Sequence, residues 1–170
     1  MDITKLQMPQ WYAFATRARH EKKVNEHLQS AGMESFLPVR KTLNQWKDRK
    51  KWIESPLFPS YIFAKIPYKN RLDVLTLPSV IDIVGINNQP CPVRPEEIEA
   101  IKLLLNSNSG FDVNMGLSMG NRVRICSGPL IGLEGVIAQI RGGTRVVFNI
   151  SALGKSIVIN ASDYKIKHLD

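Results

Sequence analysis

The chain has 170 residues, of which 44% are hydrophobic and 22% are charged, the balance of a folded protein rather than a disordered one. Its 23 Lys and Arg residues against 15 Asp and Glu residues give a net charge of +8, which favours polyanionic partners such as nucleic acid. No apolar run reaches the roughly 18 residues that a membrane helix needs, so we expect no membrane association. The N-terminal residues lack a signal-peptide pattern, which predicts a cytoplasmic protein.

Two cysteines, Cys91 and Cys126, each stand alone in an apolar context. A disulfide scaffold or a zinc site would need more cysteines at tighter spacing. We therefore expect two reduced, buried thiols, no metal site and no cofactor.

A polar segment, Asn106–Gly110, predicts the boundary between two domains, because its residues can neither bury an apolar face nor hold a helix. We expect a first domain over residues 8–105, a linker over 106–117 and a second domain over 118–170.

The first domain alternates between strand and helix patterns. Trp11–Ala15 is rich in aromatic residues, as in a buried strand, and Val24, Leu28 and Ala31 form the apolar stripe of a helix that begins near residue 19. Further strands are predicted over 34–39, 58–66 and 80–86, a short helix over 69–76, and a long basic hairpin or loop over 40–55.

A last helix of this domain begins at Pro95, the residue favoured in a first helical turn. Glu96 and Glu97 then lie at the positive end of the helix dipole. The resulting order of strands and helices predicts an α+β sandwich, in which helices pack on an antiparallel sheet.

The second domain has no helical periodicity. Arg122–Ile125 alternates between polar and apolar residues, and Arg141–Thr144 is typical of a hairpin turn. Together with the β-branched runs near residues 135–140, 145–150 and 156–159, this predicts four or five short strands that close as a small β-barrel.

Motifs of catalysis do not occur. The sequence contains no G-x-S-x-G, no P-loop and no H-E-x-x-H, and its three histidines show no catalytic spacing with acids or cysteines. We therefore expect no catalytic residue and a protein that is not an enzyme.

One candidate interface lies where Pro56 and Pro59 bracket Leu57 and Phe58 ahead of a strand. A stiff turn of this kind can hold aromatic rings in a shallow apolar surface that receives a helix of a partner. The alternative is that Phe58 and the following aromatic residues are ordinary core.

Basic residues cluster at the start of the first helix and in the 40–55 segment, where Trp46 and Trp52 flank the charges. Such interleaving suits nucleic acid, because phosphates take the charge and bases stack on rings. The alternative is a solvated loop with its tryptophans packed on the domain. The candidate nucleic-acid-binding residues are Arg17, Arg19, His20, Lys22, Lys23, Arg40 and Lys41.

A third candidate is the turn between two strands of the second domain, where Gly128-Pro129 and Gly132-x-x-Gly135 demand unusual backbone torsions. We expect this turn to place Leu130 and Ile131 at an exposed tip that a partner contacts.

These motifs resemble a known family. Gly120–Ile125 followed by Ser127–Ile137 resembles the KOW module of ribosomal and transcription proteins. The whole chain from Trp11 to about Lys167 is similar to the NusG family of transcription elongation factors. The further segments that carry this resemblance are Trp11–Tyr12, the helix bearing Glu21 and Lys23, Phe36–Pro38, Leu57–Tyr61, Pro90–Val93 and Glu96–Ile98.

The resemblance implies an N-terminal NGN-like sandwich followed by an SH3-like KOW barrel. It implies that the first domain binds the clamp helices of the largest subunit of bacterial RNA polymerase and suppresses pausing, while the barrel recruits a ribosomal protein or another factor. The implied polymerase pocket is formed by Tyr12, Phe14, Leu57, Phe58, Pro59 and Tyr61; the implied partner-binding residues of the barrel are Gly128, Pro129, Leu130 and Ile131.

Within the family, the chain looks like a specialised antiterminator of the UpxY or RfaH type, which acts at polysaccharide operons and recognises non-template DNA or leader RNA. Ser60 stands where the general factor usually has Gly. The His-Thr-Thr-Thr stretch of RfaH has no counterpart here, since the aligned region reads Arg71–Val74, so the contact made by that stretch is not implied. In RfaH the second domain can also fold as a helical hairpin; the β-branched residues of this second domain favour strands and predict a barrel, and a change of fold is not assumed.

Two other readings stay open. The protein could be a housekeeping elongation factor of the same family, or a KOW-containing ribosome- or RNA-binding protein that needs no polymerase pocket.

Overall fold

The computed structural model describes residues 7–45, 48–87, 89–107, 111–115, 120–140 and 143–169. The chain divides into two compact units, Met1–Arg94 and Pro95–Asp170. The expected boundary at residue 106 therefore lies later in the chain than the observed division, because the helix that starts at Pro95 contacts elements of the second unit.

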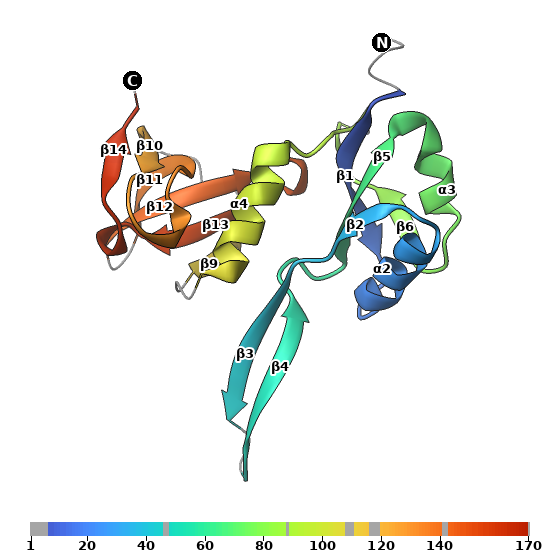
Figure 1. Ribbon diagram of the computed structural model, residues 1–170, viewed down its shortest axis with the longest axis horizontal. Helices are drawn as coiled ribbons and strands as arrows, with labels where there is room; N and C mark the ends of the chain where they lie inside the picture. Colours follow the sequence, from blue (N-terminus) through green and yellow to red (C-terminus); the bar gives the residue numbers. More distant parts are fainter. Residues whose placement is uncertain are drawn as a thin grey trace. The chain divides into compact units, whose positions relative to one another are not determined.

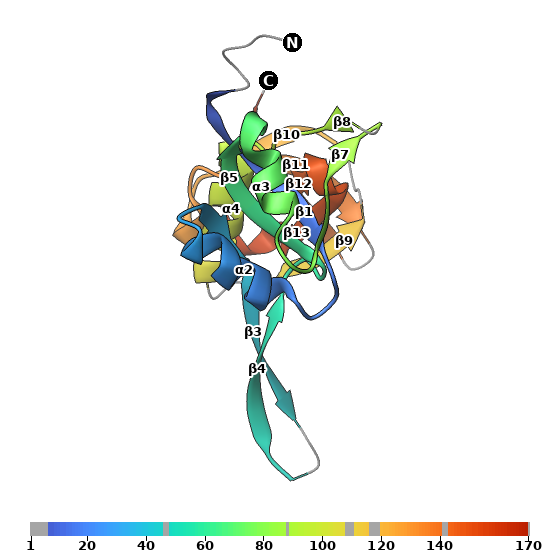
Figure 2. The same cartoon turned by 90° about the vertical axis from the view of Figure 1, so that its right-hand side faces the viewer.

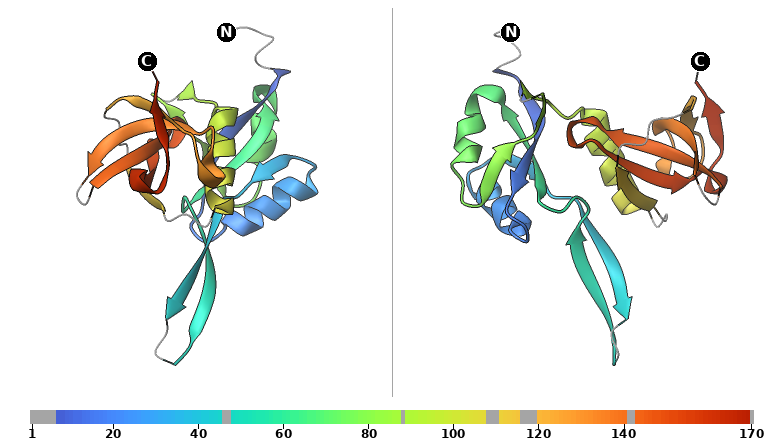
Figure 3. Two further views of the ribbon diagram at one scale, coloured as in Figure 1. Left: turned by 60° about the vertical axis from the view of Figure 1, so that its left-hand side comes forward. Right: turned by 180° about the vertical axis from the view of Figure 1, so that it is seen from behind.

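The first unit contains a four-stranded antiparallel sheet in the order β2-β5-β1-β6. Its strands are β1 (Pro9–Thr16), β2 (Glu34–Phe36), β5 (Tyr61–Pro67) and β6 (Val80–Ile83), and its helices are α2 (Glu21–Ser30), the 3₁₀ turn η1 (Tyr68–Asn70) and α3 (Arg71–Leu75). Figures 1 and 3 show α2 and α3 on the same side of this sheet. The predicted α+β arrangement of an antiparallel sheet with helices is confirmed for this unit.

The core of the first unit lies between the sheet and the two helices. Phe14 faces Ile62 across β1 and β5, and both side chains are buried with Leu28 of α2 and Val74 of α3. Burying an aliphatic or aromatic side chain of this size contributes about 1.5–3 kcal/mol relative to leaving it exposed. The apolar stripe that predicted α2 is therefore the surface that docks this helix on the sheet.

A two-stranded arm leaves the sheet between β2 and β5. Its strands are β3 (Val39–Gln45) and β4 (Lys50–Pro56), which pair in antiparallel register, and Figures 1 and 2 show the arm extending away from the sheet. The predicted strand over 34–39 is wrong in extent, because β2 ends at Phe36 and the chain passes through Pro38 before β3 begins. The carbonyl of Pro38 instead accepts a hydrogen bond from the backbone N–H of Leu57 at 2.8 Å.

The predicted strand over 80–86 is likewise divided. β6 ends at Ile83, and a separate strand, β7 (Gly85–Ile86), pairs with β8 (Gln89–Pro90).

The second unit contains α4 (Pro95–Asn106) and one antiparallel sheet in the order β14-β10-β11-β12-β13-β9. Its strands are β9 (Phe111–Met115), β10 (Arg122–Ile125), β11 (Glu134–Ile140), β12 (Gly143–Ile150), β13 (Lys155–Asn160) and β14 (Ile166–His168), with the 3₁₀ turns η2 (Gly128–Leu130), η3 (Ser151–Leu153) and η4 (Ala161–Asp163). β9 lies within the expected linker, where it pairs with β13. The strand pairings of the described residues leave β14 and β9 at opposite ends of the sheet, so a closed barrel is not shown.

Helix α4 packs on the other elements of the second unit through a carboxylate as well as through apolar side chains. The Glu97 carboxylate accepts hydrogen bonds from the Ser151 hydroxyl at 2.9 Å and from the Ser151 backbone N–H at 3.3 Å, at the start of η3. Ile98, Ile101 and Leu104 of α4 are buried. This arrangement accounts for the division of the chain before Pro95.

Cys91 is half-buried and Cys126 is exposed, so the expectation of two buried thiols is wrong; Cys126 follows the alternation of β10, in which Val123 and Ile125 point inward. In the predicted 141–144 turn, Arg141 and Gly142 lie outside the described residues. No helix in the described part of the chain is long and apolar enough to cross a membrane.

Candidate functional site

The turn Leu57–Tyr61 is the first candidate surface, and it is fixed by backbone hydrogen bonds. Ser60 has a φ of 65°, in the left-handed region that costs roughly 1–2 kcal/mol for a residue with a side chain. Its carbonyl accepts a hydrogen bond from the N–H of Thr16 at 2.8 Å, and its N–H donates to the Glu21 carboxylate at 2.8 Å. Glu21 is buried at the N-terminus of α2, so a single carboxylate serves both the helix end and the turn.

The rings of this region form a packed set rather than an open pocket. Phe58 is fully buried and meets Phe63 edge to face, with ring centroids 6.1 Å apart. Phe63 in turn stacks on Phe36 at 6.2 Å. Phe58 is therefore a core residue, which is the alternative stated for it above, and Leu57 is buried as well. Pro59 is exposed and Tyr61 is half-buried, so these two residues present the surface of the turn.

Tyr12 and Phe14 do not lie with that surface. Both belong to the core cluster beneath α2 and α3, where they share a face with Ile62 and Ala64. Tyr61 alternates to the opposite face of β5, so one pocket cannot draw on all three aromatic side chains. The six residues of the expected pocket therefore do not share one surface. Burial raises the pKa of the Tyr12 phenol, whose hydroxyl donates to the Gln10 side chain at 3.2 Å.

The basic residues that precede α2 lie in a loop that is tied to Ser79, the residue directly before β6. The His20 imidazole Nδ1 lies 2.7 Å from the Ser79 hydroxyl, and the backbone N–H of Arg17 donates to the carbonyl of Ser79. Arg19 has a φ of 65°, which a right-handed helix does not allow. The helix therefore begins after it, at Glu21, and not at residue 19. Arg17, Arg19 and Lys23 have exposed side chains, whereas His20 is half-buried.

Two basic clusters that are distant in the sequence meet at one acidic residue. The Glu54 carboxylate of β4 forms two ion pairs. Its oxygens lie 3.1 Å from the ammonium nitrogen of Lys22 in α2 and 3.3 Å from that of Lys41 in β3. The hydrogen bond from Lys22, followed by that from Lys41, holds the pKa of the Glu54 carboxyl below its usual value. Sequence reasoning proposed both lysines and missed Glu54, because only the register Lys41↔Glu54 brings the carboxylate to them.

Farther along the arm, two large apolar side chains are exposed. Leu43 and Trp52 are directly opposite each other across β3 and β4, with 46% and 66% of their surfaces exposed. Trp52 therefore does not pack back on its domain, which excludes that alternative for this residue, while Trp46 lies outside the described residues. Arg40 at the base of the arm is half-buried.

The turn of the second unit matches its prediction in part. Gly128 and Gly132 have φ values of 74° and 89°, as predicted, whereas the prediction for Gly135 is wrong because its φ is not positive. Ile131 is 64% exposed. Pro129 is exposed too. The prediction for Leu130 is wrong, because the 3₁₀ turn η2 directs this side chain inward and buries it completely.

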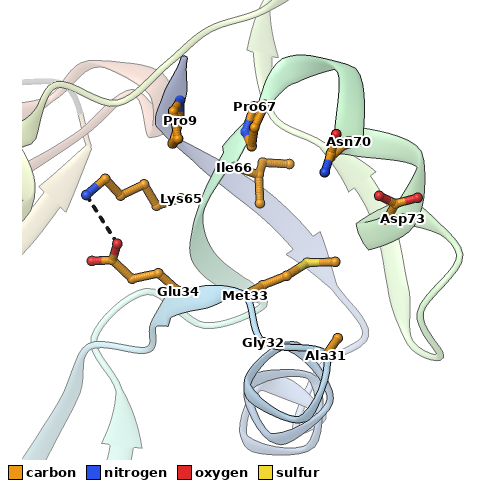
Figure 4. A pocket seen from close by; sticks show the side chains of 10 residues that line it. All are labelled: Pro9, Ala31, Gly32, Met33, Glu34, Lys65, Ile66, Pro67, Asn70 and Asp73. Atoms are coloured by element: carbon orange, nitrogen blue, oxygen red, sulfur yellow. Dashed lines mark ion pairs between the residues drawn. The ribbon is translucent and has the colours of Figure 1, made fainter. Parts of the chain in front are cut away.

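One cavity of the first unit, of about 550 Å³, lies apart from these surfaces. Figure 4 shows Glu34 and Lys65 on its wall, joined by an ion pair at 3.2 Å, with Met33 and Asp73 elsewhere in the lining. None of the predicted binding residues lines it. The described residues contain no group of three metal-ligating side chains.

Comparisons with known proteins agree with the family resemblance. A sequence model described as "NusG: Transcription termination factor nusG" matches residues 9–102, more than half of the chain. The transcription termination/antitermination protein NusG of Borreliella burgdorferi is 24% identical over 150 residues, which cover 76% of this chain and 82% of that protein. The protein of the same name from Helicobacter pylori is 24% identical over 165 residues, covering 89% and 94% of the two chains.

Among solved structures, one titled "Domain interaction in Thermotoga maritima NusG" is similar in fold, with a TM-score of 0.52 and 24% identity. The similarity covers 95% of this chain and 98% of that one. With the sequence model matching residues 9–102, the chain belongs to the NusG family of transcription factors.

Proposed function

We propose that the protein is a transcription elongation and antitermination factor that binds RNA polymerase through its first unit and suppresses pausing or termination. The observation that carries this proposal is the family match over residues 9–102, which spans the sheet, both of its helices and the arm. The named relatives are termination/antitermination proteins and are matched over most of their length.

The proposed polymerase contact is the surface of the turn at Pro59 and Tyr61. The partner is the pair of clamp helices in the largest subunit, which the family resemblance implies. Leu57 and Phe58 are buried beneath this surface and support it, and the Glu21–Ser60 hydrogen bond fixes its backbone. A preorganised turn loses little conformational freedom on binding, which favours affinity.

The proposed nucleic-acid contact lies beside the ion-paired cluster at the base of the arm. Lys22, Lys23 and Lys41 are exposed there, with Arg17 and Arg19 in the preceding loop. Exposed lysines and arginines neutralise phosphates and release counterions. The ligand we propose is non-template DNA or leader RNA at the transcribing polymerase.

For the second unit we propose the KOW role, recruitment of a ribosomal protein or another factor. The side chains available at its turn are Pro129 and Ile131, since Leu130 is buried. We further propose a specialised factor that acts at polysaccharide operons. The housekeeping alternative is favoured by the names of the matched relatives, which are those of NusG itself.

Retention of the full-length protein by immobilised RNA polymerase tests the proposal. We expect Tyr61→Ala to lower retention at least severalfold. Leu72→Ala removes an exposed side chain of α3, on the side of the sheet opposite Tyr61, and serves as the matched control. Equal retention of Tyr61→Ala and the control would remove the turn from the polymerase interface.

A separate measurement is needed to show whether the protein acts only at polysaccharide operons. Run-on transcription across a polysaccharide operon and an unrelated operon is expected to show an effect on the first alone. Equal effects on both would favour the housekeeping role.

A further inference from the structure

The Leu43–Trp52 pair joins the two strands of the arm as a cross-strand pair, yet among the described residues it stays largely open to solvent. The two side chains face each other across β3 and β4, and most of the tryptophan surface is open to solvent. An exposed tryptophan loses the burial that normally stabilises an aromatic side chain. Such a ring on an extended arm is a candidate binding group.

The same face of the arm carries positive charge on both sides of this pair. Because side chains on one face of a strand repeat every second residue, the Lys41–Glu54 pair precedes Leu43–Trp52 and the Gln45–Lys50 pair follows it. Successive pairs on one face lie about 7 Å apart along the strand. Lys50 is exposed, as is Lys51 on the other face.

The arm as a whole is strongly basic. Residues 39–56 contain six Lys and Arg residues against two acidic ones, Asp48 and Glu54. Glu54 is already engaged by Lys22 and Lys41, so its charge is compensated locally. The surroundings of Trp52 therefore attract an anionic ligand.

A protein partner fits this surface less well than nucleic acid does. Stable protein interfaces bury at least about 1,200 Å² in total, and their centres are depleted in charged residues. The Leu43–Trp52 pair is instead a small apolar area bordered by lysines. Aromatic rings set among cations are the usual means by which proteins hold unpaired bases.

We propose that the arm binds single-stranded nucleic acid by stacking an unpaired base on Trp52, with Leu43 beside the ring and Lys50 near a flanking phosphate. This inference rests on the proposed nucleic-acid function and narrows its ligand to unpaired nucleotides. Bases in a duplex are stacked on one another and expose only their edges, so a duplex offers this ring no face.

The test compares two single strands that have equal charge but differ in their bases, and adds a duplex in which the bases are paired. Fluorescence anisotropy measures binding of the full-length protein to a labelled oligothymidine, to an abasic strand of the same length and to a duplex. We expect the wild type to bind oligothymidine roughly tenfold more tightly than the abasic strand. Trp52→Ala is expected to reduce this ratio to near one, with an unchanged slope of log affinity against log salt.

Two variants control for side-chain loss and for the chemistry of the ring. Ile86→Ala removes an exposed apolar side chain of β7, outside the arm, and is expected to bind like the wild type. Trp52→Phe keeps an aromatic face and is expected to retain most of the preference for oligothymidine.

The possible failures are distinguishable. A wild type that binds all three ligands equally, with Trp52→Ala unchanged, overturns the stacking proposal and leaves the nucleic-acid function in place. A wild type that binds none of them overturns both, while its retention by RNA polymerase still reports separately on the polymerase contact.

Discussion

The turn Leu57–Tyr61 and the β3–β4 arm are consecutive in the chain, and each is tied to α2 by a glutamate, yet the two carboxylates lie in opposite environments. Glu21 is buried and accepts a hydrogen bond from the backbone of Ser60. Glu54 is exposed and is engaged by two lysine side chains. A buried carboxylate holds a backbone conformation, whereas an exposed one mainly sets the charge of a surface.

The largest expected effect comes from removing the buried carboxylate. Glu21→Ala leaves the half-buried N–H of Ser60 without its acceptor and is expected to lower the free energy of unfolding by about 1–3 kcal/mol. Urea denaturation of the full-length protein measures the change. Glu21→Gln retains an acceptor oxygen and is expected to cost less; an equal loss in both variants would mean that the charge at the helix end matters more than the turn.

A smaller effect of opposite sign is expected at the other end of the same hydrogen bond. Ser60→Gly removes the side chain that disfavours a φ of 65°, and we expect a gain of up to about 1 kcal/mol, because the added flexibility of glycine offsets part of the relief. Thermal unfolding detects the shift. Asn87→Gly, at an exposed position with a φ of 52°, is the control for glycine at another left-handed position; a loss of stability at Ser60 alone would show that its side chain makes a needed contact.

For the exposed carboxylate we expect a change in binding with almost none in stability. Glu54→Gln frees Lys22 and Lys41 for phosphates, so affinity for nucleic acid should rise and the salt dependence should steepen by up to roughly 0.7–0.9 per lysine engaged. Anisotropy titrations at several salt concentrations measure both. An unchanged slope would show that neither lysine reaches a phosphate.

The dependence of stability on pH offers a further test of the Glu54 ion pairs. Its pKa is lowered in the folded protein, so the ion pairs contribute to stability above the usual carboxyl pKa and are lost as the pH falls through the lowered value. Because the pair is exposed, the wild type and Glu54→Gln should differ in melting temperature only slightly across this range.

Local patterns predicted the elements well, and contacts between distant residues account for most of what they missed. The stripe of Val24 and Leu28 predicted α2 correctly, because helical periodicity is visible within ten residues. The contact between Glu21 and Ser60 spans 39 residues and has no local signal.

The errors at the candidate sites have the same origin. The family resemblance grouped Tyr12 and Phe14 with Tyr61 in one pocket, although α2 and α3 bury the first two residues in this chain. The turn at Gly128 was predicted from glycine spacing, whereas the burial of Leu130 depends on how η2 packs. Strand β9 has a polar N-terminal flank and is recognisable mainly by its pairing with β13.

The register of the arm also limits how its length can change. Because successive residues of a strand point to opposite faces, inserting one residue into β4 between Glu54 and Trp52 would turn Trp52 to the other face and separate it from Leu43. Insertions beyond the Leu43–Trp52 pair, toward the tip, leave that pair where it is. The arm can therefore be lengthened at its far end without disturbing the pair, while its base tolerates only changes that keep the two strands in step.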